Sequence, residues 1–188
     1  MDDLEIIAQV VGVVGMVLNI VSFVQKRQKT IILWQLCGAV FWTTHYCLLG
    51  IAQGTVLVGF ILNIVAIIRA IVYSNKEKFH AESNWWIFGF TLSYIAAYVC
   101  AFAVFGKEPT LKNFLLELLP VIGMVSLTVG FKMKKAVHVR ALGYINSPAW
   151  LTYNIAHLSI SGIICEVFTL ISMTIGVLKH DIKKKENE

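Results

Sequence analysis

The stretch VVGMVLNIVSF, residues 13–23, decides the fold because a close copy of it, VIGMVSLTVGF, occupies residues 121–131. The likeness extends further, since residues 13–67 align with residues 121–175 without a gap at a constant offset of 108 positions. Thirteen aligned positions are identical, among them Gly15/Gly123, Phe23/Phe131, Lys26/Lys134, Trp42/Trp150 and Gly54/Gly162. Each copy contains three hydrophobic runs, so the pattern predicts a duplicated three-helix unit.

The composition excludes an ordinary soluble domain. Of the 188 residues, 57% are hydrophobic and 14% are charged, and the mean hydropathy is +0.73. Soluble domains have about 25% charged residues, so the solvent for most of this chain must be lipid. The net charge of +5 comes from basic residues in short loops between apolar runs, where they orient helices. We therefore predict a lipid bilayer as partner and no nucleic acid.

A membrane-spanning helix needs about 20 apolar residues. Seven runs approach this length, at residues 6–24, 31–49, 55–73, 85–105, 111–131, 141–158 and 163–178. A three-helix unit starts on one side of the membrane and ends on the other. Its copy can point the same way only if one extra helix, here 85–105, carries the chain back. The predicted fold is an all-α membrane protein with seven transmembrane helices, in which two parallel three-helix bundles flank a linker helix (3+1+3).

This arrangement divides the chain into four parts. Residues 1–73 form the first bundle, residues 74–110 the linker with the fourth helix, residues 111–179 the second bundle and residues 180–188 a charged cytoplasmic tail. Basic loops follow the first, third and fifth helices, whereas the turns after the second and sixth are uncharged. The positive-inside rule then places the N-terminus outside and the C-terminus in the cytoplasm. The acidic start lacks the features of a secretory signal, so the first run is expected to stay as a helix.

Motifs for catalysis or metal binding are absent from the sequence. The four cysteines lie in apolar runs without a CxxC spacing, which favours buried thiols over a disulfide framework or a metal site. No nucleophile–base arrangement or phosphate-binding glycine loop is present. We expect no enzyme activity, no cofactor and no metal.

Polar and bulky residues inside the apolar runs are the candidates for binding. A charge at the centre of a membrane helix costs about 2.5–3.5 kcal/mol on insertion scales, so such groups persist when they face inward. Trp42 and Trp150 could stack on a flat ring from opposite sides, or act as wedges that fix each bundle. The other candidates for solute binding are His45, Asn63, Tyr153 and Asn154, and each could instead make a hydrogen bond between helices.

Glu117 and Glu166 are the acids within apolar runs. Either could take up a proton or bind a cation, which makes both candidates for proton or ion coupling. The structural alternative places Glu117 at the membrane interface near Lys112 and lets Glu166 accept a hydrogen bond from Ser161 or Tyr153.

Several motifs resemble the bacterial inner-membrane YgjV family. They are ELLPVIG at residues 117–123, HYCLLG at 45–50, LNI at 62–64 with Arg69, Asn154, and the pattern from Gly162 to Glu166. The resemblance covers roughly residues 12–177 and implies an inner-membrane location more than an activity. The wider architecture is similar to the SWEET, PQ-loop and PnuC transporters, which implies a solute site near the midplane between the halves. This chain lacks a Pro-Gln dipeptide, and Asn63 is matched by Ile171.

Two functions follow as hypotheses. The first is a carrier or facilitator for an unknown small solute, working by rocking of the two bundles. The second is a membrane receptor or accessory protein that binds without transport. A polar cavity between the bundles would favour the carrier, and a sealed apolar interface the accessory role. The sequence leaves the oligomeric state open, a homo-oligomer included.

Overall fold

The computed structural model describes residues 3–182, and every regular element in this range is helical. The elements are α1 (Asp3–Phe23), α2 (Gln28–Ala52), α3 (Val58–Ser74), α4 (Lys76–Phe79), α5 (Asn84–Ala103), α6 (Leu111–Lys132), α7 (Ala136–Ala156), α8 (Ile160–Val177) and a final π-helical turn (Leu178–Ile182). The predicted all-α fold is confirmed. Each predicted apolar run has a counterpart, and the short helix α4 is additional.

The helix boundaries repeat at the same offset as the sequence. Helices α2 and α7 begin at Gln28 and Ala136, 108 positions apart, and helices α1 and α6 end at Phe23 and Lys132, within one residue of the same offset. The third pair differs, because α8 starts at Ile160, which is earlier in its repeat than the start of α3 at Val58. Helix α5 has no counterpart in this repeat.

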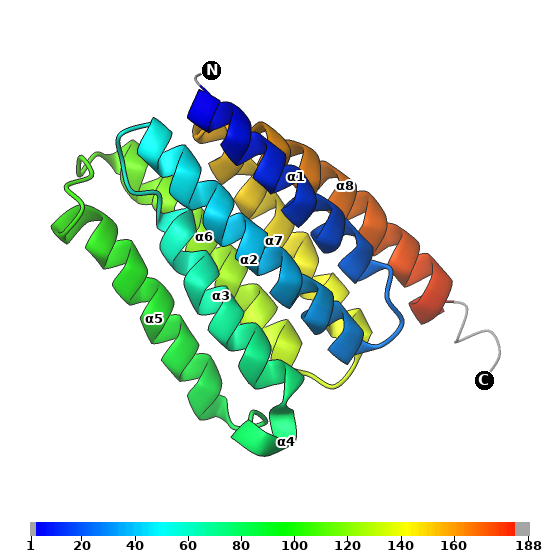
Figure 1. Ribbon diagram of the computed structural model, residues 1–188. Coiled ribbons are helices and arrows are strands. Elements are labelled where there is room, and N and C mark those ends of the chain that lie inside the picture. Colours follow the sequence, from blue (N-terminus) through cyan, green and yellow to red (C-terminus); the bar gives the residue numbers. More distant parts are fainter. Residues whose placement is uncertain (1–2, 183–188) are drawn as a thin grey trace.

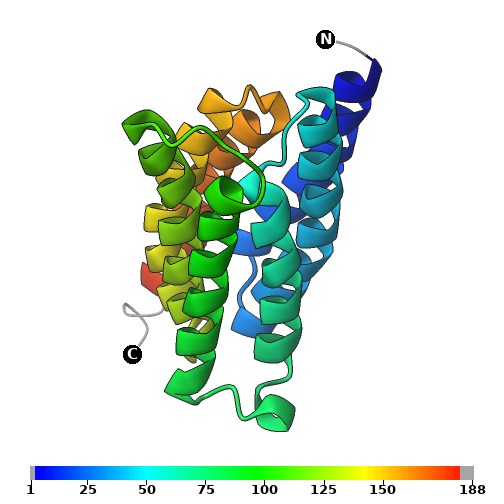
Figure 2. The same ribbon diagram turned by 90° about the vertical axis from the view of Figure 1, so that its left-hand side faces the viewer.

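Successive long helices run in opposite directions, so α1 and α8 end at the same end of the bundle (Figure 1). Helix α2 packs between α1 and α3, and α7 packs between α6 and α8. The two sets of three meet along α1–α8 and along α3–α6, while α2 and α7 face each other across the interior. Figure 2 shows α5 on the outside of the bundle, where it packs against α3 and α6.

Five of the helical segments are long and apolar enough to cross a membrane: α1, α2, α5, α6 and α8 together with its final turn. Helix α3 is apolar but shorter. Helix α7 is long but more polar, since it contains Arg140, Asn146 and Ser147, all of which are buried. Length and composition therefore identify five candidate spans within residues 3–182, where the sequence predicted seven.

One packing contact occurs in both halves and explains two of the matched pairs. A Cβ atom added to Gly15 of α1 would lie 3.2 Å from the Trp42 ring, and one added to Gly123 of α6 would lie 3.2 Å from the Trp150 ring. Each glycine thus provides the space into which the tryptophan of the next helix packs. The sequence identity reflects the same helix–helix contact made twice.

The segment before α7 differs from the prediction. We predicted a basic loop over residues 132–140 and a helix from residue 141, but α7 already begins at Ala136. Arg140 is fully buried and pairs with Asp181 at 2.9 Å, so it is not a loop charge. It anchors the π-helical turn, which includes the start of the predicted tail. Residues 183–188 of that tail lie outside the described residues.

The glycine contacts give a first prediction. Gly15→Val and Gly123→Val should each lower stability by about 1–3 kcal/mol, because the added side chain overlaps a tryptophan ring. The measurement is the midpoint of thermal unfolding in detergent. Gly89→Val is the matched control, since Gly89 is exposed in the middle of α5 and a Cβ there meets nothing within 4 Å. Equal midpoints for all three variants would contradict the proposed contact.

Candidate functional site

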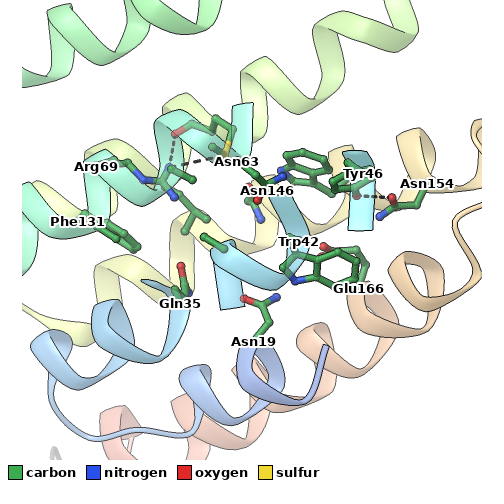
Figure 3. A pocket seen from close by; sticks show the side chains of 16 residues that line it. Asn19, Gln35, Trp42, Tyr46, Asn63, Arg69, Phe131, Asn146, Asn154 and Glu166 are labelled. Carbon is green, nitrogen blue, oxygen red and sulfur yellow. Dashed lines mark hydrogen bonds between the residues drawn. The ribbon is translucent and has the colours of Figure 1, made fainter. Parts of the chain in front are cut away.

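A cavity of about 70 Å³ lies in the interior, between the two sets of three helices. Every long helix except α5 contributes to its wall (Figure 3). Five amide side chains line it: Asn19, Gln35, Asn63, Asn146 and Asn154. Four aromatic side chains also line it: Trp42, Tyr46, Phe131 and Trp150. Two charged residues, Arg69 and Glu166, complete the polar part of the wall.

The cavity brings together five of the residues proposed from the sequence: Trp42, Asn63, Trp150, Asn154 and Glu166. His45, Tyr153 and Glu117 are not part of its wall. Five further polar lining residues were not among those predicted from the sequence to bind solute: Asn19, Gln35, Tyr46, Arg69 and Asn146.

The two tryptophans lie on either side of Tyr46. Its ring centroid is 5.9 Å from that of Trp42 and 5.7 Å from that of Trp150, with an interplanar angle of 31° in both cases. The Tyr46 hydroxyl donates a hydrogen bond to Oδ1 of Asn154 at 2.6 Å, which joins α2 to α7. The position between the tryptophans, where we considered a flat ligand ring, thus holds the ring of Tyr46.

His45 and Tyr153 make hydrogen bonds between helices. The ring nitrogens of His45 lie 2.8 Å from the Ala8 carbonyl oxygen of α1 and 2.8 Å from Oγ of Ser159, which precedes α8. The Tyr153 hydroxyl accepts a hydrogen bond from the Gly59 amide at the start of α3, at 3.1 Å. Both side chains are fully buried. Their contacts favour the structural alternative over a direct role in the cavity.

Arg69 is the main cavity residue that the sequence reasoning missed. Its Nη1 donates to the Met124 carbonyl oxygen at 3.1 Å, and its guanidinium carbon lies 4.6 Å from the centre of the Phe131 ring, a cation–π arrangement. In the sequence it stands near a helix end beside a basic segment, as an orienting charge would. One feature of the sequence pointed to Arg69. Asn63, Ala66 and Ala70 lie on the same side of α3 as Arg69, and two small alanines beside an arginine favour an open space there.

Neither cavity charge is neutralised by an ion pair within residues 3–182. Glu166 is 7% exposed and its Oε2 has no hydrogen-bond partner, and Oδ1 of Asn146 is buried without a partner as well. Arg69 is 4% exposed, and its Nε also lacks a partner. The cavity therefore combines a basic and an acidic side chain, which form no ion pair with each other, with aromatic and amide walls.

A sequence profile of the Imp-YgjV family, described as a bacterial inner membrane protein, matches residues 6–184. The chain belongs to this family. The resemblance found in the sequence is confirmed, and with it the inner-membrane location. No significant match is found among curated proteins or among solved structures, so the similarity to SWEET-type transporters stays a prediction.

A second polar group of this Imp-YgjV protein lies outside the cavity, near the start of α6. Glu117 is fully buried, and its Oε1 pairs with Lys107 of the α5–α6 loop and accepts from Nε2 of His157 at 3.3 Å. Burial and the Lys107 ammonium lower the pKa of His157 to about 4, so the imidazole is neutral near pH 7. Burial also lowers the pKa of Lys107. This group ties the α5–α6 loop to the end of α7, which favours a structural role for Glu117.

The depressed pKa of His157 predicts a loss of stability in acid. Between its ordinary pKa of 6.5 and about 4, the unfolded chain binds the proton that the folded protein excludes, so stability falls as the pH falls through this window. Between pH 6.5 and pH 5 the loss should be about 2 kcal/mol, at 1.36 kcal/mol for each pH unit. The measurement is the unfolding midpoint in detergent as a function of pH.

His157→Gln should remove most of this acid sensitivity. His80→Gln is the matched control, because His80 is exposed in the α4–α5 connection. If both variants keep the pH profile of the parent protein, another group is responsible for it.

Proposed function

We propose that this Imp-YgjV protein is a small-solute carrier or facilitator whose seven long helices span the inner membrane in a 3+1+3 arrangement. The repeated helix boundaries and the glycine–tryptophan contact made in both halves support two equivalent bundles. Helix α5, without a counterpart, would be the linker that lets the second bundle point the same way as the first. The absence of a catalytic motif from the sequence supports a role in binding and transport rather than catalysis.

Helices α3 and α7 fit this arrangement despite their length and composition. At a rise of 1.5 Å per residue, the 17 residues of α3 extend roughly 26 Å and the 21 residues of α7 roughly 32 Å, and a bilayer core is about 30 Å thick. The polar residues that lower the hydropathy of α7, such as Arg140 and Asn146, are buried inside the bundle. They would not face lipid, so they need not prevent α7 from crossing.

The observation that carries the proposal is the polar cavity between the two sets of helices. A protein that only needed a stable scaffold would fill this interface with apolar side chains, because each buried polar group without a partner costs free energy. Here amides, an arginine and a glutamate line an open space instead. Solute sites between parallel repeats occur at this place in SWEET-type transporters.

Hydrogen bonds near both ends of the bundle join the two sets of helices. Towards the start of α3, the bonds Tyr46–Asn154 and Tyr153–Gly59 join the two sets. At the other end, Nε2 of Gln28 donates to the Phe131 carbonyl oxygen at 3.1 Å. Transport by rocking would break the contacts at one end while those at the other end hold. Glu166, inside the cavity, is the proposed site for a coupling proton or cation.

The proposed orientation, with the N-terminus outside and the C-terminus in the cytoplasm, is testable in cells. Glu108→Cys, in the exposed α5–α6 loop, should react with a membrane-impermeant maleimide after the outer membrane is permeabilised. Glu77→Cys, exposed in α4, should react only after the inner membrane is opened. Both changes are made in a background in which the four natural cysteines are replaced by serine or alanine. The reverse labelling pattern would mean an inverted protein.

The carrier function is testable with purified protein in liposomes. A broad panel of labelled small solutes should contain at least one that enters protein-containing vesicles faster than empty ones. Asn63→Leu should lower this flux at least tenfold, because it replaces an amide of the cavity wall with an alkyl group. Ile64→Leu is the control, since the neighbouring Ile64 is exposed on the outer surface of α3.

Two results would count against the carrier. If no solute of the panel shows either flux or binding, the carrier function is excluded. Binding of a solute without any flux would favour the receptor or accessory role instead.

A further inference from the structure

Three buried polar atoms of the cavity residues have no hydrogen-bond partner within residues 3–182. One is a donor, Nε of Arg69, and two are acceptors, Oδ1 of Asn146 and Oε2 of Glu166, whose carboxyl group lies near the Ser147 hydroxyl without a well-formed hydrogen bond. Native proteins satisfy most buried polar atoms, so each exception needs an explanation. Three exceptions around one cavity indicate groups that a bound molecule would satisfy.

Arg69 and Glu166 are ionisable, which strengthens the case that a bound molecule satisfies their unpartnered atoms. A buried charge without a counter-charge is strongly unfavourable, and Arg69 and Glu166 do not form an ion pair with each other or with any other described residue. In Figure 3 Arg69 lies at one side of the cavity, beside Phe131, and Glu166 lies at the other side. A positive and a negative side chain thus enter the same space from different helices and remain apart.

We infer that the cavity binds a small zwitterion, a solute of the amino-acid class that carries one carboxylate and one ammonium group. This inference rests on the proposed function, since it takes the cavity to be the solute site. The carboxylate accepts hydrogen bonds from the guanidinium of Arg69, including its free Nε–H. The ammonium group, which has three N–H donors, donates to Oε2 of Glu166 and Oδ1 of Asn146.

The walls fit such a solute. The rings of Trp42 and Trp150 are part of the cavity wall, and aromatic ring faces attract an ammonium group. The cavity volume of about 70 Å³ corresponds to roughly five to seven water-sized positions at about 10–15 Å³ each, which suits a small amino acid. A metal ion is a poor fit for the cation position, because residues 3–182 contain no group of three or more His, Cys, Asp or Glu side chains placed to hold one.

The test compares each zwitterion with analogues that lack one of its charges. L-Alanine is matched by propionate, which lacks the ammonium group, and by ethylamine, which lacks the carboxylate. β-Alanine and 4-aminobutyrate, each with its own pair of analogues, extend the series to larger charge separations. Binding to the full-length protein in detergent is measured by calorimetry. For at least one set, the zwitterion should bind at least tenfold more tightly than either analogue.

Two variants assign the charges to the two ends of the solute. Arg69→Gln should remove the advantage of the zwitterion over the amine, and Glu166→Gln should remove its advantage over the carboxylate. Arg69→Lys retains the charge but not the planar donor fork, so it should weaken binding and keep the preference for the zwitterion. It also serves as the second variant if Arg69→Gln does not fold. Glu82→Gln is the control, because the Glu82 side chain is 66% exposed and pairs with Lys134.

The remaining outcomes separate this inference from the proposed function. A carboxylate that binds as tightly as its zwitterion would overturn the inference, because the ammonium group would then contribute nothing to binding. A neutral solute whose binding is weakened by Asn63→Leu but not by Arg69→Gln or Glu166→Gln would overturn it and leave the carrier intact. Failure of every zwitterion and every other solute to bind would overturn both.

Discussion

Polar side chains are unfavourable against lipid, so they must face the interior of the helix bundle. The rest of the structure depends on this constraint. Arg140 and Asn146 of α7 and Glu166 of α8 are all buried, while large apolar side chains such as Leu92 and Ile171 are exposed. A soluble protein reverses this pattern. Because inward-facing polar groups need partners, they bring the helices together and, where partners are missing, surround the cavity.

The two halves share a helix arrangement and differ in some of the side chains at matched positions. Gly15 with Trp42 and Gly123 with Trp150 make the same contact twice. Two matched positions that hold different residues can still both make a contact with the other half. His45 of α2 contacts Ser159, which precedes α8, and Tyr153 of α7 contacts Gly59 at the start of α3. The sequence difference between His45 and Tyr153 therefore changes the chemistry of a link between the halves rather than that of the cavity.

Other residue differences between the halves change which side chains line the cavity. Asn63 lines it, while the residue at its matched position, Ile171, is 50% exposed on the outer surface. Glu166 lines it, while its counterpart Val58 is buried at the start of α3. The third helices of the two halves bury different faces, since Asn63 and Ala66 are buried in α3 while their counterparts Ile171 and Thr174 are exposed in α8. A nearly symmetric frame thereby holds an asymmetric set of polar groups, as an asymmetric solute requires.

The sequence by itself determined the helical class, the duplication, the family and five of the cavity residues. These properties follow from features that can be read directly along the chain: apolar runs of membrane-spanning length, a constant offset between the copies, and polar residues within the runs. In lipid such a run must form a helix, because its backbone polar groups have no water to bond to. Only the tertiary structure decided that Arg69 faces the cavity, that Arg140 pairs with Asp181 and that Tyr46 lies between the tryptophans. Each of these depends on the rotation of one helix relative to its neighbours, and that rotation is set by packing contacts between residues far apart in the chain.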